Sequence, residues 1–262
     1  MTTPQYSPPA APEAIPDNPP RVKPIVALGG MYRLLLRQQL TKGRVLLALV
    51  MGALGILVCT IIARESEIVD VVPVVEFLSV FALGLAIPIL SLVLASSSLG
   101  HLVEDETLVY LWLRPAPRWI LALSAYLASL TVALPSTVVP FSIAAWVGLE
   151  GDTSGTLALA YATALAVVAY CGIFVFIGLI LRRSLIWGLL YVFIWEFFVA
   201  RAGQGAARLS INTYPSSLLS RLTEVELPLA ERSMTAAITV PPVVAVIAVG
   251  LTAWQLNRAN VA

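Results

Sequence analysis

The sequence predicts an all-α polytopic membrane protein with six transmembrane helices and with its N- and C-termini in the cytoplasm. Three observations lead to this fold class. The chain of 262 residues is 59% hydrophobic and only 12% charged, whereas a soluble domain carries about 25% charged residues. Six long apolar runs follow one another along the chain, and the basic residues gather on one side of them. A water-soluble enzyme and a disordered chain are both excluded, and the net charge of +1 gives no sign of a nucleic-acid partner.

The N-terminal segment differs from the rest of the chain. Residues 1–24 are rich in proline, which predicts a disordered cytoplasmic tail, and residues 25–262 form the membrane domain. The tail has no charged stretch followed by an apolar core, so we do not expect a cleaved signal peptide. From Leu28 to Arg44 the pattern predicts an amphipathic helix at the membrane interface, with Arg33 and Arg37 on its basic face. A soluble helix packed on a partner protein is the alternative.

The apolar runs define the expected spans. A span needs about 20 helical residues to cross a hydrocarbon core of ~30 Å, and the fifth run is short by this measure. Prolines lie within the second, third and sixth runs, so these helices need neighbours that satisfy the freed carbonyl groups. The spans are expected at about 45–63, 74–99, 119–148, 157–181, 185–200 and 236–254.

Basic residues determine the predicted orientation. Eleven of the 16 lysines and arginines lie in the N-terminal segment, the even-to-odd connections and the C-terminal tail, and five lie on the opposite side. The side with more basic residues is expected to be cytoplasmic. The external connection 201–235 contains amphipathic pieces broken by glycine and proline. They could form short or re-entrant helices that dip into the outer membrane face, or a plain solvated loop.

A search for catalytic residues yields none. His101 is the one histidine, and its carboxylate neighbours Glu104, Asp105 and Glu106 suit a solvated charge cluster better than a metal site, which needs further nitrogen or sulfur ligands. The chain has no Gly-Lys dipeptide, so it lacks a phosphate-binding loop. Two ionisable residues, Glu76 and Glu196, lie within predicted spans. Such residues are costly in a membrane and often mark a transport pathway. Glu196 could also face the 201–235 segment and pair with Arg201 or Arg208.

The most informative stretch is the cytoplasmic connection around 101–118. It begins with carboxylates, continues as a short apolar helix and breaks at Arg114-Pro115, and a second helix begins near Arg118. A helix across the inner face with a sharp elbow is suited to receive force from a soluble partner. An ordinary interfacial turn is the alternative.

This stretch resembles the type-2 ABC transporter permeases, the membrane-spanning subunits of ABC exporters. The resemblance rests on the order Glu104, Thr107-Leu108, Leu111, Arg114-Pro115-x-x-Arg118-x-x-Leu121. The chain departs from the family in having Glu106 where a glycine is usual, and no lysine after the arginine. The basic amphipathic helix, the six spans and the Tyr214-Pro215 region also resemble the family, so the likeness covers about residues 28–258.

The resemblance implies a half-transporter in a bacterial plasma (inner) membrane. Two permease subunits, identical or related, would stand above two cytoplasmic ABC ATPase subunits, which would bind the ATP and Mg that this chain does not hold. The coupling candidates are Glu104, Asp105, Glu106, Arg114 and Arg118, together with Arg33 and Arg37 of the amphipathic helix. The implied activity is ATP-driven export, and the apolar spans favour amphipathic or lipid-like cargo.

Three other functions remain open from the sequence. Glu76 and Glu196 could serve an ion-coupled secondary transporter or a channel. The chain could instead be a membrane anchor or scaffold that binds an ATPase and forms no conduit of its own. A membrane enzyme that uses His101 is the last alternative.

Overall fold

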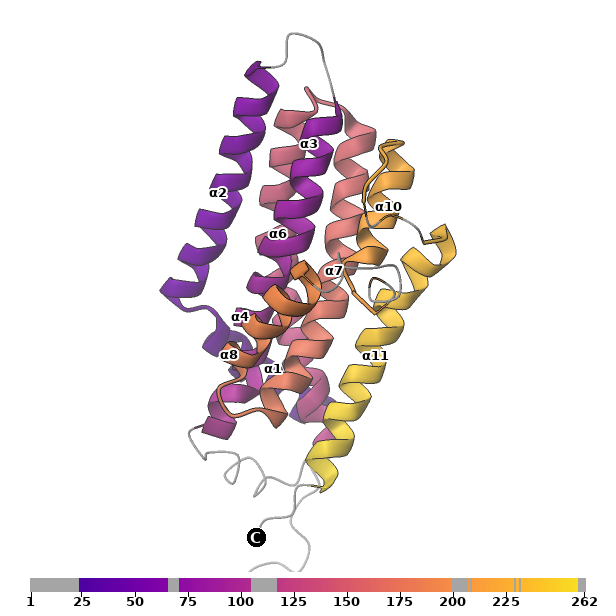
Figure 1. The fold of residues 1–262 in the computed structure, drawn as a ribbon. Coiled ribbons are helices and arrows are strands. Elements are labelled where there is room, and N and C mark those ends of the chain that lie inside the picture. Colours follow the sequence, from indigo (N-terminus) through magenta and orange to yellow (C-terminus); the bar gives the residue numbers. More distant parts are fainter. Residues whose placement is uncertain are drawn as a thin grey trace, which may run out of the picture.

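The computed structural model describes residues 24–65, 71–104, 117–198, 207, 209–228, 230 and 232–258, with the backbone alone given for residues 24, 101–104 and 197. These residues form helices and the turns between them, and no strand occurs among them. Figure 1 shows the long helices side by side in one bundle. The helices are α1 (Pro24–Gln39), α2 (Lys42–Glu65), α3 (Val71–Leu78), η1 (Ser79–Ala86), α4 (Ile87–Glu104), α6 (Arg118–Gly148), α7 (Thr153–Ile180), α8 (Ser184–Leu190), η2 (Tyr191–Phe198), α10 (Thr213–Thr223) and α11 (Met234–Arg258).

Five helical stretches in the described part of the chain are long and apolar enough to cross a membrane. They are Lys42–Glu65, Val71–Gly100, Arg118–Gly148, Thr153–Ile180 and Met234–Arg258. The all-α membrane fold is therefore confirmed at this level. The run predicted at 185–200 forms α8 and η2, whose apolar part is Ser184–Glu196. Even at the α-helical rise this part is about 20 Å long, so it is too short to cross a ~30 Å core.

The amphipathic helix begins and ends earlier in the chain than predicted. A single helix was expected from Leu28 to Arg44, but α1 ends at Gln39 and α2 begins at Lys42. The carbonyl oxygen of Thr41 accepts hydrogen bonds from the backbone N–H groups of Arg44 and Val45, which starts a new helix in a new direction. Lys42 and Arg44 thus belong to the first long apolar helix. Helix α1 also begins at Pro24, within the segment predicted to be a disordered tail.

The core is built around α7, which packs against α4, α6, α10 and α11. Small residues allow these helices to approach closely, as is usual in membranes. A Cβ added at Gly178 would lie 2.5 Å from the backbone oxygen of Ser96 in α4, and one at Gly172 would lie 2.9 Å from the Cα of Ala245 in α11. Helix α2 approaches α6 in the same way, with Gly52 against Pro140. Buried alanines and glycines on α7 thus set how closely its neighbours approach, beside larger buried side chains such as Tyr170 and Phe174.

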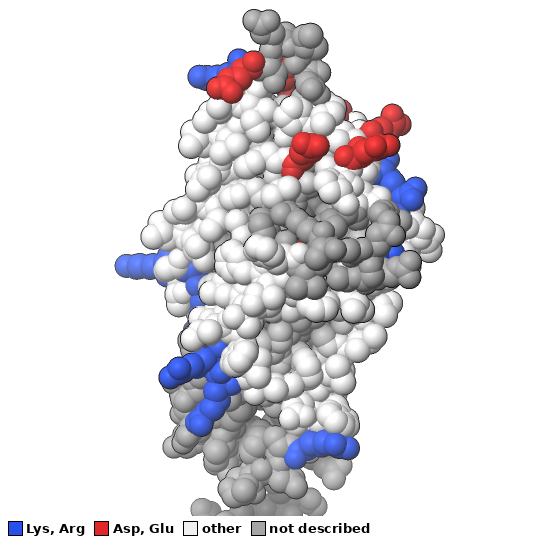
Figure 2. All heavy atoms as spheres, in the orientation of Figure 1, with Lys and Arg blue, Asp and Glu red and all other residues white. Residues whose placement is uncertain are grey.

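Charged side chains separate to the two ends of the bundle. On the face drawn in Figure 2, red side chains lie toward the top and most blue ones lie lower. The half of the bundle in which α6 begins and α11 ends is called the cationic end, and it carries the described side chains of Arg33, Arg37, Lys42, Arg44, Arg118, Arg182, Arg183 and Arg258, with Lys42 and Arg44 at the level of the middle of α6. The acidic end, where α2 ends and α3 begins, carries those of Glu65, Glu76, Glu150, Asp152, Glu224 and Glu226, with Arg64, Arg221 and Arg232.

Helix α7 begins at the acidic end with an N-cap that fits its sequence. The carboxylate of Asp152 accepts hydrogen bonds from the backbone N–H groups of Gly155 and Ser154, at 2.8 and 3.1 Å. These bonds, and one from the Ser154 hydroxyl, stabilise the ionised carboxylate and lower the pKa of Asp152 below its ordinary value of 3.8. The exposed carboxylate also lies at the positive end of the helix dipole.

Candidate functional site

A break between η2 and α10 creates the most unusual site in the described part of the chain. Figure 1 shows η2 ending about half way along the bundle and α10 continuing from there toward the acidic end. Helix α10 packs against α7 and α11 and buries Pro215, Leu218 and Leu219. The described part of the 201–235 segment is therefore a packed half-helix that follows a half-helix, and not a plain solvated loop.

Glu196 lies at this break and is buried, with 2% of its surface exposed. Its Oε1 accepts hydrogen bonds from the Tyr191 hydroxyl at 2.8 Å and from the backbone N–H of Ile211 at 3.1 Å. Its Oε2 accepts from the Ser210 hydroxyl at 2.5 Å and from the backbone N–H of Asn212 at 3.4 Å. All four contacts bring donors to the carboxylate, so both oxygens act as acceptors.

The local helix geometry brings Tyr191 to the carboxylate. Residues 191–198 form a π-helix, in which residues five apart stand one turn apart. Tyr191 and Glu196 are separated by five positions and so share one face of η2. In an ordinary α-helix they would point in different directions.

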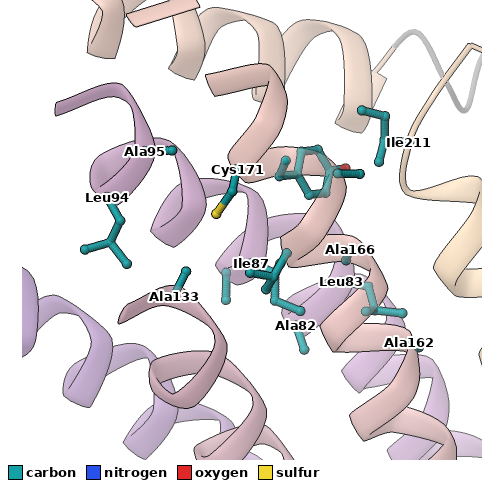
Figure 3. Close-up of a cluster of buried hydrophobic side chains, with 14 of the residues drawn as sticks. Ala82, Leu83, Ile87, Leu94, Ala95, Ala133, Ala162, Ala166, Cys171 and Ile211 are labelled. Carbon is teal, nitrogen blue, oxygen red and sulfur yellow. The ribbon is translucent and has the colours of Figure 1, made fainter. Parts of the chain in front are cut away.

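The surroundings of Glu196 are tightly packed. Figure 3 labels Ile211 in the same cluster of buried side chains as Ala82 and Leu83 of η1, Ile87 of α4, and Ala166 and Cys171 of α7. Asn212 accepts a hydrogen bond from Ser216, and its Nδ2 would lie 3.4 Å from a Cβ added at Gly84 in η1. Two π-helical segments, η1 and η2, therefore meet at the start of α10. Such segments are common at functional sites.

Tyr170 of α7 adds a second buried hydroxyl. Its side chain is fully buried and close enough to Glu196 to interact with the carboxylate. Its hydroxyl nevertheless makes no well-formed hydrogen bond among the described residues. The ring stacks on Phe174, with centroids 5.8 Å apart, and this contact fixes its position beside the break.

The chemistry of this site is first that of a helix cap. The N-terminus of a helix carries unsatisfied N–H groups and a partial positive charge, and Glu196 supplies the acceptor and the negative charge to α10. The carboxylate thereby joins two half-helices that no continuous backbone hydrogen-bond ladder connects. In broken helices of transporters, such half-helix ends commonly lie near the bilayer midplane and face ions or substrate. Here the negative group belongs to the chain itself.

The other intramembrane candidate has a different setting. Glu76 in α3 is exposed at the acidic end, one turn before η1, and its backbone carbonyl accepts a bond from Ser79. The structure does not bring Glu76 and Glu196 together, because Glu196 contacts residues 191 and 210–212. Arg201 and Arg208, the predicted partners of Glu196, lie outside the described residues.

Most coupling candidates lie at or beyond the edge of the described chain. Asp105, Glu106 and Arg114 lie outside the described residues. Glu104, of which only the backbone is described, is the last residue of α4. Arg33 and Arg37 are exposed on α1. Helix α1 crosses the first half of α6, where Tyr32 donates to Thr131 and Gln39 donates to Ser129, each at 2.9 Å.

Arg118 has a role that the sequence did not predict. Its guanidinium donates to the carbonyl oxygens of Leu256 and Asn257, at 2.6 and 3.0 Å. These are C-terminal carbonyls of α11, which lack intrahelical partners. Arg118 therefore connects the start of α6 to the end of α11. No pattern within either segment could have shown this contact, since the residues are more than 130 positions apart.

Sequence reasoning also missed the partners of Glu196. Ser210 and Asn212 follow a stretch with no periodic pattern, so their approach to the carboxylate depends on tertiary packing. The five-residue spacing of Tyr191 and Glu196 indicates a shared face only once the π-helix is known.

Among the described residues, no group of three or more His, Cys, Asp and Glu side chains comes together to hold a metal ion. Comparison of the chain with protein-family models and with curated proteins gives no match to either.

Proposed function

We propose that the chain is the membrane-spanning permease subunit of an ATP-driven ABC transporter, energised by a separate ATPase chain. The proposal starts from the resemblance of residues 101–121 to type-2 ABC permeases. A permease of this kind must pass a movement of its cytoplasmic connection to its membrane helices. We identify the cationic end with the cytoplasmic side, because the excess of basic residues there favours this orientation.

The observation that best supports the proposal is the hydrogen bonding of Arg118 to α11. The connection between α4 and α6 ends at Arg118, and this side chain is bonded to the last carbonyls of α11. Helix α1 is bonded to α6 through Tyr32 and Gln39. A force applied to the connection would thus reach α6, α11 and α1 together, which is what coupling to an ATPase requires.

The lateral surface suits a partner permease and lipid. Large apolar side chains are exposed along α2, α8, η2 and α11, among them Leu57, Ile186, Phe193 and Val246. One part of this surface would face lipid and another a second permease subunit, identical or related. A wall of this composition favours export of amphipathic or lipid-like cargo over export of small hydrophilic ions.

Co-purification tests the proposal. The chain, solubilised in mild detergent from its native host, should bring down a protein with a phosphate-binding loop, and Arg118→Glu should weaken that association while membrane insertion persists. Arg64→Glu, at the acidic end, is the matched control and should leave the association unchanged. Purification without any ATPase, or full transport by the Arg118→Glu variant, would count against the proposal.

The broken helix favours a second candidate, an ion-coupled transporter. Discontinuous helices with a buried ionisable residue are typical of such proteins. Under this reading Glu196→Gln should abolish transport with no dependence on an ATPase. Under the leading proposal, transport requires the ATPase. Glu196→Gln then lowers the stability of the chain, and transport by the variant still depends on ATP.

A further inference from the structure

The region between α1, α2 and α6 contains a cavity of about 690 Å³, within the usual range for ligand pockets. Its walls are Val45, Leu49 and Ala53 of α2, and Pro135, Val139 and Ile143 of α6. The cavity lies beside Gly52 and Pro140, where α2 and α6 make their close contact. It is therefore a slot between two long helices, closed at one end by α1.

The slot has the depth of one membrane leaflet. It extends along α2 from Arg44 to Ile56, which is about 18 Å at the α-helical rise. Half of a ~30 Å hydrocarbon core is about 15 Å. An acyl chain that lies parallel to the helices would thus fill the slot from Arg44 to Ile56.

The two ends of the slot differ in polarity. The polar lining residues Gln39, Arg44, Thr131 and Ser136 lie toward the cationic end, and the residues beyond Ala53 on α2 and beyond Ser136 on α6 are apolar. Arg44 is the one charged residue among the described lining residues, and its guanidinium donates to the carbonyl oxygen of Gln38 at 3.0 Å. This bond holds the cation over the corner between α1 and α2.

Further cations lie at the same corner. Lys42 is two positions before Arg44, and Arg37 is in the last turn of α1. Basic pockets between helices at a membrane surface bind anionic lipid headgroups, and a guanidinium suits a phosphate in particular. We infer that the slot is a binding site for one anionic phospholipid, with its phosphate beside Arg44 and an acyl chain between α2 and α6. This site does not depend on the proposed transport function.

The test measures bound lipid on the purified full-length chain. The protein is incubated with phosphatidylglycerol or with phosphatidylethanolamine of the same acyl chains, and retained lipid is counted by native mass spectrometry. The wild-type chain should retain about one phosphatidylglycerol and less phosphatidylethanolamine. Arg44→Gln should lower the ratio of the two about fivefold, the equivalent of ~1 kcal/mol for one cation near a membrane surface. Arg33→Gln, on the exposed face of α1 outside the slot, should leave the ratio unchanged.

A second pair of variants tests the acyl-chain part of the slot. Ala53→Trp fills the cavity and should remove both lipids, whereas Leu54→Trp, exposed on the opposite side of α2, should retain them. The inference would be overturned if the ratio of retained phosphatidylglycerol to phosphatidylethanolamine were the same for wild type and Arg44→Gln. So would an Ala53→Trp variant that keeps its lipid but loses a self-association present in the wild type, because a second copy would then occupy the slot. If Ala53→Trp does not fold, the ratio measured on folded Arg44→Gln decides.

Discussion

Replacing Glu196 tests whether this carboxylate joins the two half-helices. In Glu196→Gln, the amide oxygen can keep one of the two donor pairs, and the amide NH₂ group then faces the other pair. A hydroxyl in that pair can rotate to accept, but the backbone N–H of Ile211 or Asn212 cannot. One buried N–H therefore loses its acceptor, at a cost of about 1–3 kcal/mol.

The expected change in thermal stability follows from this cost. A chain of this size changes its melting temperature by about 2–4 °C per kcal/mol, so Glu196→Gln should melt about 2–12 °C lower. Glu196→Ala leaves both N–H groups without an acceptor and should lose about 2–6 kcal/mol. Glu76→Gln, in which an exposed carboxylate changes, is the matched control.

The two cysteines provide the assay. Cys59 and Cys171 are both buried, so a thiol-reactive dye labels them only as the helices separate, and the midpoint of labelling against temperature reports unfolding. With Cys59 replaced by Ser, the dye reports on Cys171, which is next to Tyr170 beside the break. A Glu196→Gln midpoint within about 1 °C of the Glu76→Gln midpoint would refute the capping role.

Three further predictions concern the rest of the bundle. Gly178→Ala should cost about 1–3 kcal/mol, because the new methyl group would lie 2.5 Å from the backbone of α4, whereas Gly250→Ala, with nothing within 4 Å, should melt no lower than wild type. Equal melting of the two would contradict the close contact. Asp152 has a lowered pKa, so its stabilising effect is present above the ordinary pKa of 3.8 and is lost as the pH falls below it. The stability of Asp152→Asn should therefore fall less steeply than that of wild type as the pH is lowered into this range, and an identical fall in both proteins would count against this cap. Arg118→Gln should speed hydrogen exchange in the last turn of α11 about tenfold, for a lost charged hydrogen bond of at least ~1.4 kcal/mol, and unchanged exchange there would argue against the connection.

The long apolar helices were predictable because length and composition alone determine whether a helix can cross a bilayer. The run 157–181, for example, matches α7 to within a few residues. The break at 185–200 was not predictable in the same way, because hydropathy continues through Glu196 and π-helical geometry leaves no mark in an apolar pattern. The short length of this run in the sequence correctly indicated that it differs from the other apolar runs.

The candidate site was predictable only in its central residue. Glu196 stands out in an apolar run, and the sequence predicted that it could face the 201–235 segment, as its contacts with residues 210–212 show. Its backbone partners could not be predicted, since a backbone N–H is the same for every residue type. The end of the amphipathic helix was misplaced for a related reason, because neither Leu40 nor Thr41 is a strong helix breaker.

The position of α7 has a consequence for biogenesis. Its contacts with α4 and α6 use chain that is already made when α7 enters the membrane, but those with α8, α10 and α11 use chain that is still to come. Until then the side of α7 that carries Tyr170 and the side that carries Gly172 are not yet covered by α8, α10 and α11, and the Tyr170 hydroxyl has no Glu196 beside it. Membrane insertase or chaperone contact should therefore be strongest at these two sides of α7 before α10 and α11 enter the membrane, and release should coincide with the insertion of α11.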